Sequence, residues 1–172
     1  MANNRLSNAA FYFDGTVATS SWTTLPYPGM LGQFFNKDGK KYQLVKNAST
    51  SNALAANDVC FWSDFDDFEV STDCSDTTGC ANRPAGIALG TVAAGSYCFI
   101  QVRGPYATIR TNQDDDIAAG DTIIVDTDED GQCDSVALGT ASTHVPLAIA
   151  TAADVDADDT VAGILIPPLN GE

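Results

Sequence analysis

Residues 82–125 read NRPAGIALGTVAAGSYCFIQVRGPYATIRTNQDDDIAAGDTIIV and decide the fold. Short runs rich in Val, Ile, Tyr, Phe and Thr alternate with Gly, Pro and Asp, which is the pattern of β-strands joined by tight turns. The densest apolar run covers residues 96–102, Gly104-Pro105 is expected to break it, and alternation resumes over residues 106–110. No window keeps apolar residues at helical spacing for three turns. The stretch predicts an all-β scaffold without an active site.

The same pattern continues on both sides of this stretch. Residues 33–47 predict a β-hairpin whose turn is NKDG at residues 36–39, and VCFW at residues 59–62 predicts a buried strand. Further strand patterns follow at residues 135–139, 146–150 and 161–166. We expect eight to eleven strands in a small β-sandwich or barrel-like domain, with short antiparallel strands, long acidic loops and an N-terminal arm.

The chain is expected to divide near residue 32. Residues 1–32 form a leader with an aromatic strand pattern at residues 11–13, and residues 33–172 form the β-rich domain. The leader is either an arm that orders against a neighbouring molecule or a frayed terminus with one edge strand. Within the domain, the polar insertion at residues 63–84 predicts a long surface loop crossed by a short strand near residues 68–70.

One sequence pattern occurs twice. LAANDV at residues 54–59 resembles IAAGDT at residues 117–122, and each is followed by three mostly apolar residues. Both predict a turn in which the fourth residue is left-handed and the following Asp ties the backbone before a strand starts. Two copies are too few for a solenoid. The recurrence indicates either two related β-modules or chance reuse of common turn chemistry.

The chain is strongly acidic. Its 172 residues include 23 Asp and Glu against 8 Lys and Arg, a formal net charge of −15. Nucleic-acid affinity comes mainly from Lys and Arg that displace counterions, so DNA and RNA are disfavoured partners, as are anionic membrane surfaces. No segment approaches the roughly 20 consecutive apolar residues of a membrane helix. The first residues, MANNRLSNAAFYFDG, show no secretory signal. The acidity predicts a soluble protein that resists self-association.

The five cysteines are odd in number and irregularly spaced. Cys74 and Cys80 are spaced to close a small disulfide loop, whereas Cys98 lies within a predicted core strand. Without an export signal, we expect most of the cysteines to be reduced and to pack as small hydrophobic residues. The single histidine, His144, is expected in a loop or at a strand edge, and it cannot complete a Cys/His zinc set.

The sharpest local motif is DTDEDG at residues 126–131. It fits the opening of an Asp-rich calcium loop, in which Asp126, Asp128 and Asp130 would be the ligands. The match then fails, because the twelfth residue is Ala137, where an EF-hand has a bidentate Glu. Asp130-Gly131 between two strand patterns is also a common hairpin signal. The plain acidic hairpin is therefore the favoured interpretation, and no metal or other cofactor is expected.

The sequence gives little support for a catalytic site. Asp and Glu are too numerous for a catalytic pair to be chosen by position, and no GxSxG elbow or phosphate-binding Gly loop occurs. Trp22, Tyr27 and Trp62 are candidates for stacking on sugars, although packing in a core or interface is favoured for each. We therefore expect no enzymatic activity and predict no catalytic residue.

Four segments together resemble the capsid decoration (cement) proteins of tailed bacteriophages. They are GKKYQLVKNASTSNALAANDVCFW at 39–62, PAGIALGTVAAGSYCFIQVRG at 84–104, IAAGDTIIV at 117–125 and PLAIATAADVDADDTVAGILIPP at 146–168. The resemblance covers about residues 33–169, and its shared features are Gly turns and strand starts. The cysteine-bearing insertion and the N-terminal leader depart from the family pattern.

The resemblance implies a structural virion protein that binds the outer surface of an icosahedral phage capsid and cements the shell. Such proteins often sit as trimers at three-fold or quasi-three-fold sites. The implied partners are the major capsid protein and further copies of the chain. The implied location is the capsid exterior, after synthesis in the host cytoplasm. The alternative is a carbohydrate- or calcium-dependent binding module of a surface or fibre protein.

Overall fold

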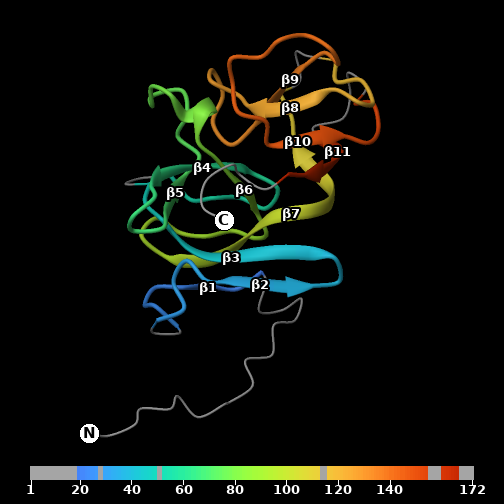
Figure 1. Ribbon diagram of the computed structural model, residues 1–172. Helices are drawn as coiled ribbons and strands as arrows, with labels where there is room; N and C mark the ends of the chain where they lie inside the picture. The colour runs from blue at the N-terminus through green and yellow to red at the C-terminus, as the bar shows by residue number, and fades with distance from the viewer. Residues whose placement is uncertain (1–18, 27–28, 50–51, 113–115, 155–159, 167–172) are drawn as a thin grey trace, which may run out of the picture.

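The computed structural model describes residues 19–26, 29–49, 52–112, 116–154 and 160–166 (Figure 1). Regular structure in these ranges is almost entirely β-strand, which confirms the predicted all-β class, and the exception is the 3-10 turn η1 (Cys80–Asn82). None of the helical structure described is long and apolar enough to cross a membrane. The strands are β1 (Ser21–Trp22), β2 (Phe34–Lys37), β3 (Lys40–Asn47), β4 (Val59–Asp64), β5 (Glu69–Ser71), β6 (Pro84–Ala88), β7 (Tyr97–Arg110), β8 (Thr122–Val125), β9 (Cys133–Val136), β10 (Ala148–Ala150) and β11 (Thr160–Leu165).

Five strands close a first small barrel. β3 pairs in parallel with β5, and antiparallel pairs then join β5 to β4, β4 to β6 and β6 to the first half of β7. The first half of β7 also pairs with β3, which completes the ring. Apolar side chains including Val45, Trp62 and Ile100 form its core cluster. Closure pairs both edges of every strand in the ring, which protects short strands from edge-to-edge association.

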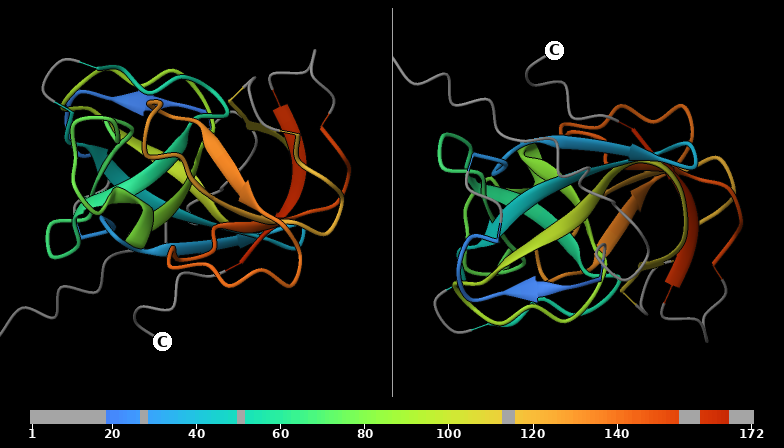
Figure 2. Two further views of the ribbon diagram at one scale, coloured as in Figure 1. Left: turned by 90° about the horizontal axis from the view of Figure 1, so that it is seen from above. Right: turned by 90° about the horizontal axis from the view of Figure 1, so that it is seen from below.

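The following strands repeat this arrangement in a second barrel. The second half of β7 pairs with β11, and antiparallel pairs join β11 to β10, β10 to β8 and β8 to β9. A parallel bridge between Thr111 and Cys133 returns the ring to the end of β7. Ile109, Ile123 and Leu165 belong to the core cluster on this side. Figure 2 shows the two barrels as adjoining lobes, one blue to green and the other orange to red, with β7 passing between them.

The two barrels have matching strand registers. Val59 lies opposite Ile87 in the β4–β6 pair, and Thr122 lies opposite Ile149 in the β8–β10 pair. The paired strands also resemble each other in sequence, because PAGIA in β6 corresponds to PLAIA at residues 146–150. The recurrence seen in the sequence therefore marks two related β-modules.

Matching turns lead into the equivalent strands β4 and β8. Asn57 and Gly120 are both left-handed, with φ of +76° and +97°, as predicted. The N–H of Asn57 donates to the carbonyl of Ala88, and the N–H of Gly120 donates to the carbonyl of Ala150, each at 2.9 Å. The turn at Asn57 is thus joined to β6, the partner of β4, and the turn at Gly120 is joined to β10, the partner of β8.

The predicted role of the Asp in each turn is also confirmed. Asp58 Oδ2 accepts a hydrogen bond from the N–H of Ala55 at 2.6 Å, and Asp121 Oδ2 accepts one from the N–H of Ala118 at 2.9 Å. Both Asp side chains are buried. A buried carboxylate is tolerated where its oxygens accept hydrogen bonds, so each Asp ties its turn closed at low cost.

β7 runs through Gly104-Pro105 without a break, so the predicted interruption is wrong. Gly104 has a φ of +94°, which bends the strand where its partner changes from β3 to β11. The buried Gln101 holds the bend, because its Nε2 lies 3.3, 3.4 and 3.0 Å from the carbonyl oxygens of Arg103, Gly104 and Pro105. Gly104 also approaches the β2–β3 turn, since an added Cβ would lie 2.6 Å from the carbonyl oxygen of Gly39.

The predicted surface loop at residues 63–84 is exposed at Ser75, Asp76, Thr78 and Gly79, but the cysteines on either side of this exposed segment are buried. Cys74 and Cys80 form a disulfide and pack, with Ala81, into the core cluster that spans both barrels. The Ser75 N–H and hydroxyl each donate to Asp130 Oδ1 at 3.0 Å. The insertion therefore connects the first barrel to an acidic turn of the second.

The other three cysteines are free and buried. They are Cys60, Cys98 and Cys133. Burial raises the pKa of the Cys98 thiol to about 12 and also raises the pKa of Cys60. Their neutral thiols pack as small apolar groups, as predicted for most of the cysteines.

Removing the disulfide, by Cys74→Ala/Cys80→Ala, is expected to lower the free energy of unfolding by about 2 kcal/mol. A cross-link across so short a loop restricts the unfolded chain by about that amount. Chemical unfolding followed by circular dichroism measures the change. Dithiothreitol should shift wild type in the same direction and leave the double variant unmoved. A wild-type midpoint that does not respond to the reductant during unfolding would contradict the prediction.

The end of the predicted leader packs against the first barrel. β1 pairs with β7, placing Ser21 opposite Cys98, and the N–H of Gly32 donates to the carbonyl of Leu44 at 2.8 Å. The Trp22 ring contacts Phe99 edge-on, with 6.0 Å between ring centroids. Residues 1–18, with the aromatic strand pattern at residues 11–13, lie outside the described residues.

Candidate functional site

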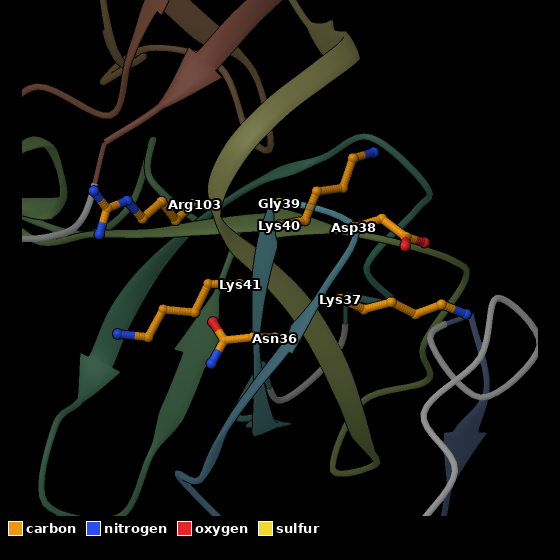
Figure 3. Close-up of a pocket in the computed structure, with 7 residues that line it drawn as sticks. All are labelled: Asn36, Lys37, Asp38, Gly39, Lys40, Lys41 and Arg103. Carbon is orange, nitrogen blue, oxygen red and sulfur yellow. The ribbon is translucent and has the colours of Figure 1, made fainter.

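Four of the eight Lys and Arg residues of this acidic chain surround one turn. The β2–β3 hairpin turns through Asp38 and Gly39, whose φ values are +52° and +76°. The turn and the adjoining part of β7 line an open depression of about 660 Å³ (Figure 3). Its four bases, hereafter the basic turn, are Lys37, Lys40, Lys41 and Arg103.

The basic turn consists of two pairs of like charges. Lys37 lies opposite Lys40 in the β2–β3 pair, and Lys41 lies opposite Arg103 in the β3–β7 pair. Like charges directly opposite one another destabilise a sheet. Among the described residues that line the depression, Asp38 is the carboxylate. The fold therefore gathers four bases around this turn.

The other three described bases each contact a carboxylate or an aromatic ring. Lys46 Nζ lies 2.7 Å from Glu69 Oε1, and this hydrogen bond raises the pKa of Lys46. Arg110 Nη1 lies 3.0 Å from Asp58 Oδ1, and the Arg83 guanidinium lies over an aromatic ring.

An exposed aromatic ring adjoins the basic turn. Phe34 and Phe35 are neighbours on β2 and point to opposite sides. Phe35 packs edge-on against Phe99, with 5.2 Å between ring centroids. The Phe34 side chain is 45% exposed, and Lys41 Nζ lies 4.0 Å from its ring centroid. The cation–π contact holds this ring beside the bases.

A shallow apolar groove of about 370 Å³ lies next to the basic turn and shares Lys40 with it. It follows the β7–β11 pair, where Pro105 and the 48% exposed Ile164 lie opposite each other. The Tyr106 hydroxyl donates to Asn57 Oδ1 at 3.0 Å, and burial raises the pKa of Tyr106 to about 12. The hydrogen bond thus fixes the Tyr106 ring, which lines the groove as an uncharged side chain. The basic turn and the apolar groove therefore adjoin at this edge of the molecule.

The acidic motif at residues 126–131 forms the connection of the β8–β9 hairpin. Asp126 is buried, and its Oδ1 accepts hydrogen bonds from the N–H groups of Asp128 at 2.8 Å and Glu129 at 3.4 Å. Its Oδ2 accepts one from Asn112 Nδ2 at 3.1 Å, while Asp130 accepts those from Ser75. Within the described ranges, no group of three or more His, Cys, Asp or Glu side chains is placed to hold a metal ion. Calcium binding by Asp126, Asp128 and Asp130 stays the less favoured alternative to the plain acidic hairpin.

The aromatic candidates for sugar stacking divide between core and surface packing. Trp62 is 2% exposed and lies in the first barrel, which confirms core packing. Trp22 is half-buried against Phe99, and Tyr27 lies outside the described residues. His144 lies in the loop before β10, where its N–H donates to Ser142 Oγ at 3.0 Å.

Sequence reasoning missed the basic turn, because a net charge of −15 conceals a local excess of bases. The signal was present, since KDGKK at residues 37–41 holds three of the eight Lys and Arg within five positions. The contribution of Arg103 depends on the pairing of β7 with β3. The strand patterns alone do not predict that pairing.

Comparison with known proteins finds distant structural similarity. No protein-family model matches the chain, and no curated protein matches it. Among solved structures, the chain is similar to the head fiber gp8.5 N base of bacteriophage phi29, with 15% sequence identity and a TM-score of 0.49. The similarity covers 73% of this chain and 92% of that chain. It is too distant to assign a function.

Proposed function

We propose that the chain is a structural virion protein that binds the outer surface of an icosahedral phage capsid and stabilises the shell. The observation that carries the proposal is the unequal distribution of charge, since half of the bases of a strongly acidic chain gather beside exposed Phe34 and the β7–β11 groove. A protein of this kind attaches by one surface and presents acidic surface to solvent. The resemblance of residues 33–169 to decoration proteins supports the same function.

The two-barrel body suits a mechanical role. Each barrel is a closed ring of short strands, and both rings share β7. A body of this kind bridges neighbouring shell subunits without changing shape. Because it binds only the assembled shell, it stabilises that state by mass action.

The proposed partners are the major capsid protein and two further copies of this chain. We propose a homotrimer at three-fold or quasi-three-fold sites, as the sequence resemblance implies. The net charge of −15 opposes contact with the packaged nucleic acid and with anionic membranes, which favours the outer face of the shell. The proposal includes no catalytic step and no cofactor.

The proposal is tested on particles of the phage that encodes the chain, with the gene deleted. Particles without the protein should release their DNA at a lower temperature, and adding back the purified chain should restore wild-type release. Electron microscopy of the restored particles should show three copies at each occupied three-fold site. Absence of the chain from purified wild-type particles, or equal heat stability with and without it, would exclude the capsid function. Any other copy number per site would exclude the trimer.

A further inference from the structure

We propose that the β7–β11 groove receives a second copy of this chain, and that the docking element of that copy is its β4–β5 turn at residues 64–68. Phe65 of the second copy enters the groove, and the acids around Phe65 lie against Lys40. Three such contacts in succession close a ring of three copies. The inference rests on the proposed function, because it names the surfaces that join the proposed homotrimer.

The receiving surface is an exposed apolar row on the outside of the second barrel. Ile149 lies opposite Ile164 in the β10–β11 pair, and Ile164 lies opposite Pro105 in the β11–β7 pair. Ile149 is 36% exposed and Ile164 is 48% exposed. The groove follows this row, and its described lining residues include Lys40 and no Asp or Glu. In a chain with 23 acids, this is a surface that an acidic partner can approach without meeting like charge.

The docking turn combines an exposed aromatic ring with three acids. It reads DFDDF, and its first four residues are exposed. Asp64 Oδ1 accepts hydrogen bonds from the N–H groups of Asp66 at 2.9 Å and Asp67 at 3.3 Å, which fixes the shape of the turn. Phe65 is 37% exposed, and its ring lies against that of Trp62 with 5.0 Å between centroids. A turn ordered in advance loses little conformational freedom on binding.

The two surfaces are complementary in chemistry. Aromatic side chains are common anchors at the centres of protein interfaces, and charged groups lie at the rim. Phe65 supplies the anchor for the apolar row around Ile164, and the acids beside it face Lys40 at the rim. Lys46 lies near the docking turn but is paired with Glu69 at 2.7 Å, so the turn remains acidic. Copies of a strongly acidic chain repel one another, so they approach best where an acidic turn meets a base.

The docking turn and the groove lie at opposite ends of the molecule. β3 runs from Lys40, which lines the groove, to Lys46, which lies opposite Glu69 of β5. The strand between them spans about 20 Å. Figures 1 and 2 likewise show β4 and β5 at one end and β11 at the other. A contact between two different surfaces is heterologous and joins copies head to tail, and it leaves no free surface when the copies close into a ring.

The test uses two variants of the full chain and one control. Phe65→Ser removes the anchor of the docking turn, and Ile164→Glu places an acid in the groove. Leu138→Glu is the control, because it makes the same change from apolar to acidic at a residue that is 76% exposed and lies outside the groove lining. The mass in solution is measured by light scattering on a sizing column over a range of protein concentrations. Circular dichroism shows whether each variant is folded.

We expect wild type and Leu138→Glu to form trimers, and Phe65→Ser and Ile164→Glu to associate at least about tenfold more weakly, as the loss of an interface anchor predicts. An equal mixture of the two variants should form dimers that contain one chain of each. The intact turn of Ile164→Glu fits the intact groove of Phe65→Ser. These dimers should not grow, because their remaining docking surfaces are the altered ones.

A charge reversal tests the rim of the contact and provides a second variant of the turn. Asp66→Lys/Asp67→Lys keeps the backbone N–H groups that bond to Asp64, so the turn keeps its shape. We expect this variant, and Lys40→Glu alone, to associate more weakly than wild type. Combining all three substitutions in one chain should restore trimers. Failure of the combined variant to recover would overturn the contact between the acids and Lys40.

The other outcomes are also decisive. Trimers of folded Phe65→Ser as stable as those of wild type would overturn the docking turn, and unchanged trimers of Ile164→Glu would overturn the groove. A mixture of folded variants that yields no dimers would overturn head-to-tail contact. Open polymers of wild type would overturn the ring of three. A monomeric wild type would overturn the inference as a whole, while heat stability of the deletion particles would still decide the capsid function separately.

Discussion

Gly104→Ala is expected to lower the free energy of unfolding by about 3 kcal/mol or more. A left-handed conformation costs a non-Gly residue about 1–2 kcal/mol. At Gly104 the new Cβ would also lie 2.6 Å from the carbonyl oxygen of Gly39 and 3.1 Å from Cα of Lys40. Both clashing atoms belong to the backbone of the β2–β3 turn, so the steric clash is removed only if the turn moves away from β7. Urea unfolding followed by circular dichroism measures the loss.

Gly95→Ala is the matched control for this substitution. Gly95 is also left-handed, with a φ of +73°, but an added Cβ would have no atom within 4 Å. Its expected cost is therefore the conformational part alone, about 1–2 kcal/mol. Equal losses for the two substitutions would show that the approach of β7 to the turn contributes nothing.

Asp58→Ala is expected to lower the free energy of unfolding by about 2–3 kcal/mol. The Asp58 side chain is 4% exposed, and it accepts hydrogen bonds from the N–H of Ala55 and from Arg110 Nη1. Burial raises the pKa of this carboxyl, and these hydrogen bonds oppose that rise. Removing the carboxylate leaves a turn N–H without its acceptor, and the cost of such a loss is about 1–3 kcal/mol. The Arg110 side chain is 43% exposed and stays hydrated, so its charge adds little.

The control is Asp58→Asn, because the Asn side-chain oxygen can still accept the hydrogen bond from the N–H of Ala55. This variant should lose about half as much free energy of unfolding as Asp58→Ala.

Asp121→Ala applies the same change to the second barrel, where Asp121 accepts from the N–H groups of Ala118 and Leu138. Because the barrels share β7, we expect each Ala variant to unfold in a single transition. Both described tryptophans lie in or against the first barrel, so their fluorescence should follow circular dichroism even in Asp121→Ala. Separate transitions would contradict shared unfolding.

Features that depend on neighbouring residues could be predicted from the sequence. The turns at Asn57 and Gly120 are an example, because a left-handed residue followed by an Asp that accepts from an N–H three positions earlier is a local arrangement. The apolar run at residues 96–102 likewise predicts a strand, which is observed as part of β7. The prediction of an acidic hairpin at residues 126–131 rests on local chemistry too.

Features that depend on distant residues could not be predicted in the same way. A Gly-Pro pair usually ends a strand. At Gly104-Pro105 the strand continues, because Gln101 binds the carbonyls of the bend and β11 replaces β3 as the partner of β7. The insertion has a polar sequence, yet Cys74, Cys80 and Ala81 are buried in the core cluster that spans both barrels. The basic turn requires β7 to lie beside β3. Each feature is decided by pairing between segments far apart in the chain.

The sharing of β7 also has a consequence for how the protein is made. The five strands of the first barrel lie within residues 40–110, and its ring is closed by the first half of β7. Chains emerge from the ribosome N-terminus first, at about 5–20 residues per second. The first barrel can therefore close before β8–β11 have all emerged. The free second half of β7 then projects from a completed ring and gives the later strands a fixed edge on which to pair. Folding order is thus built into the connectivity, with the first module acting as a template for the second.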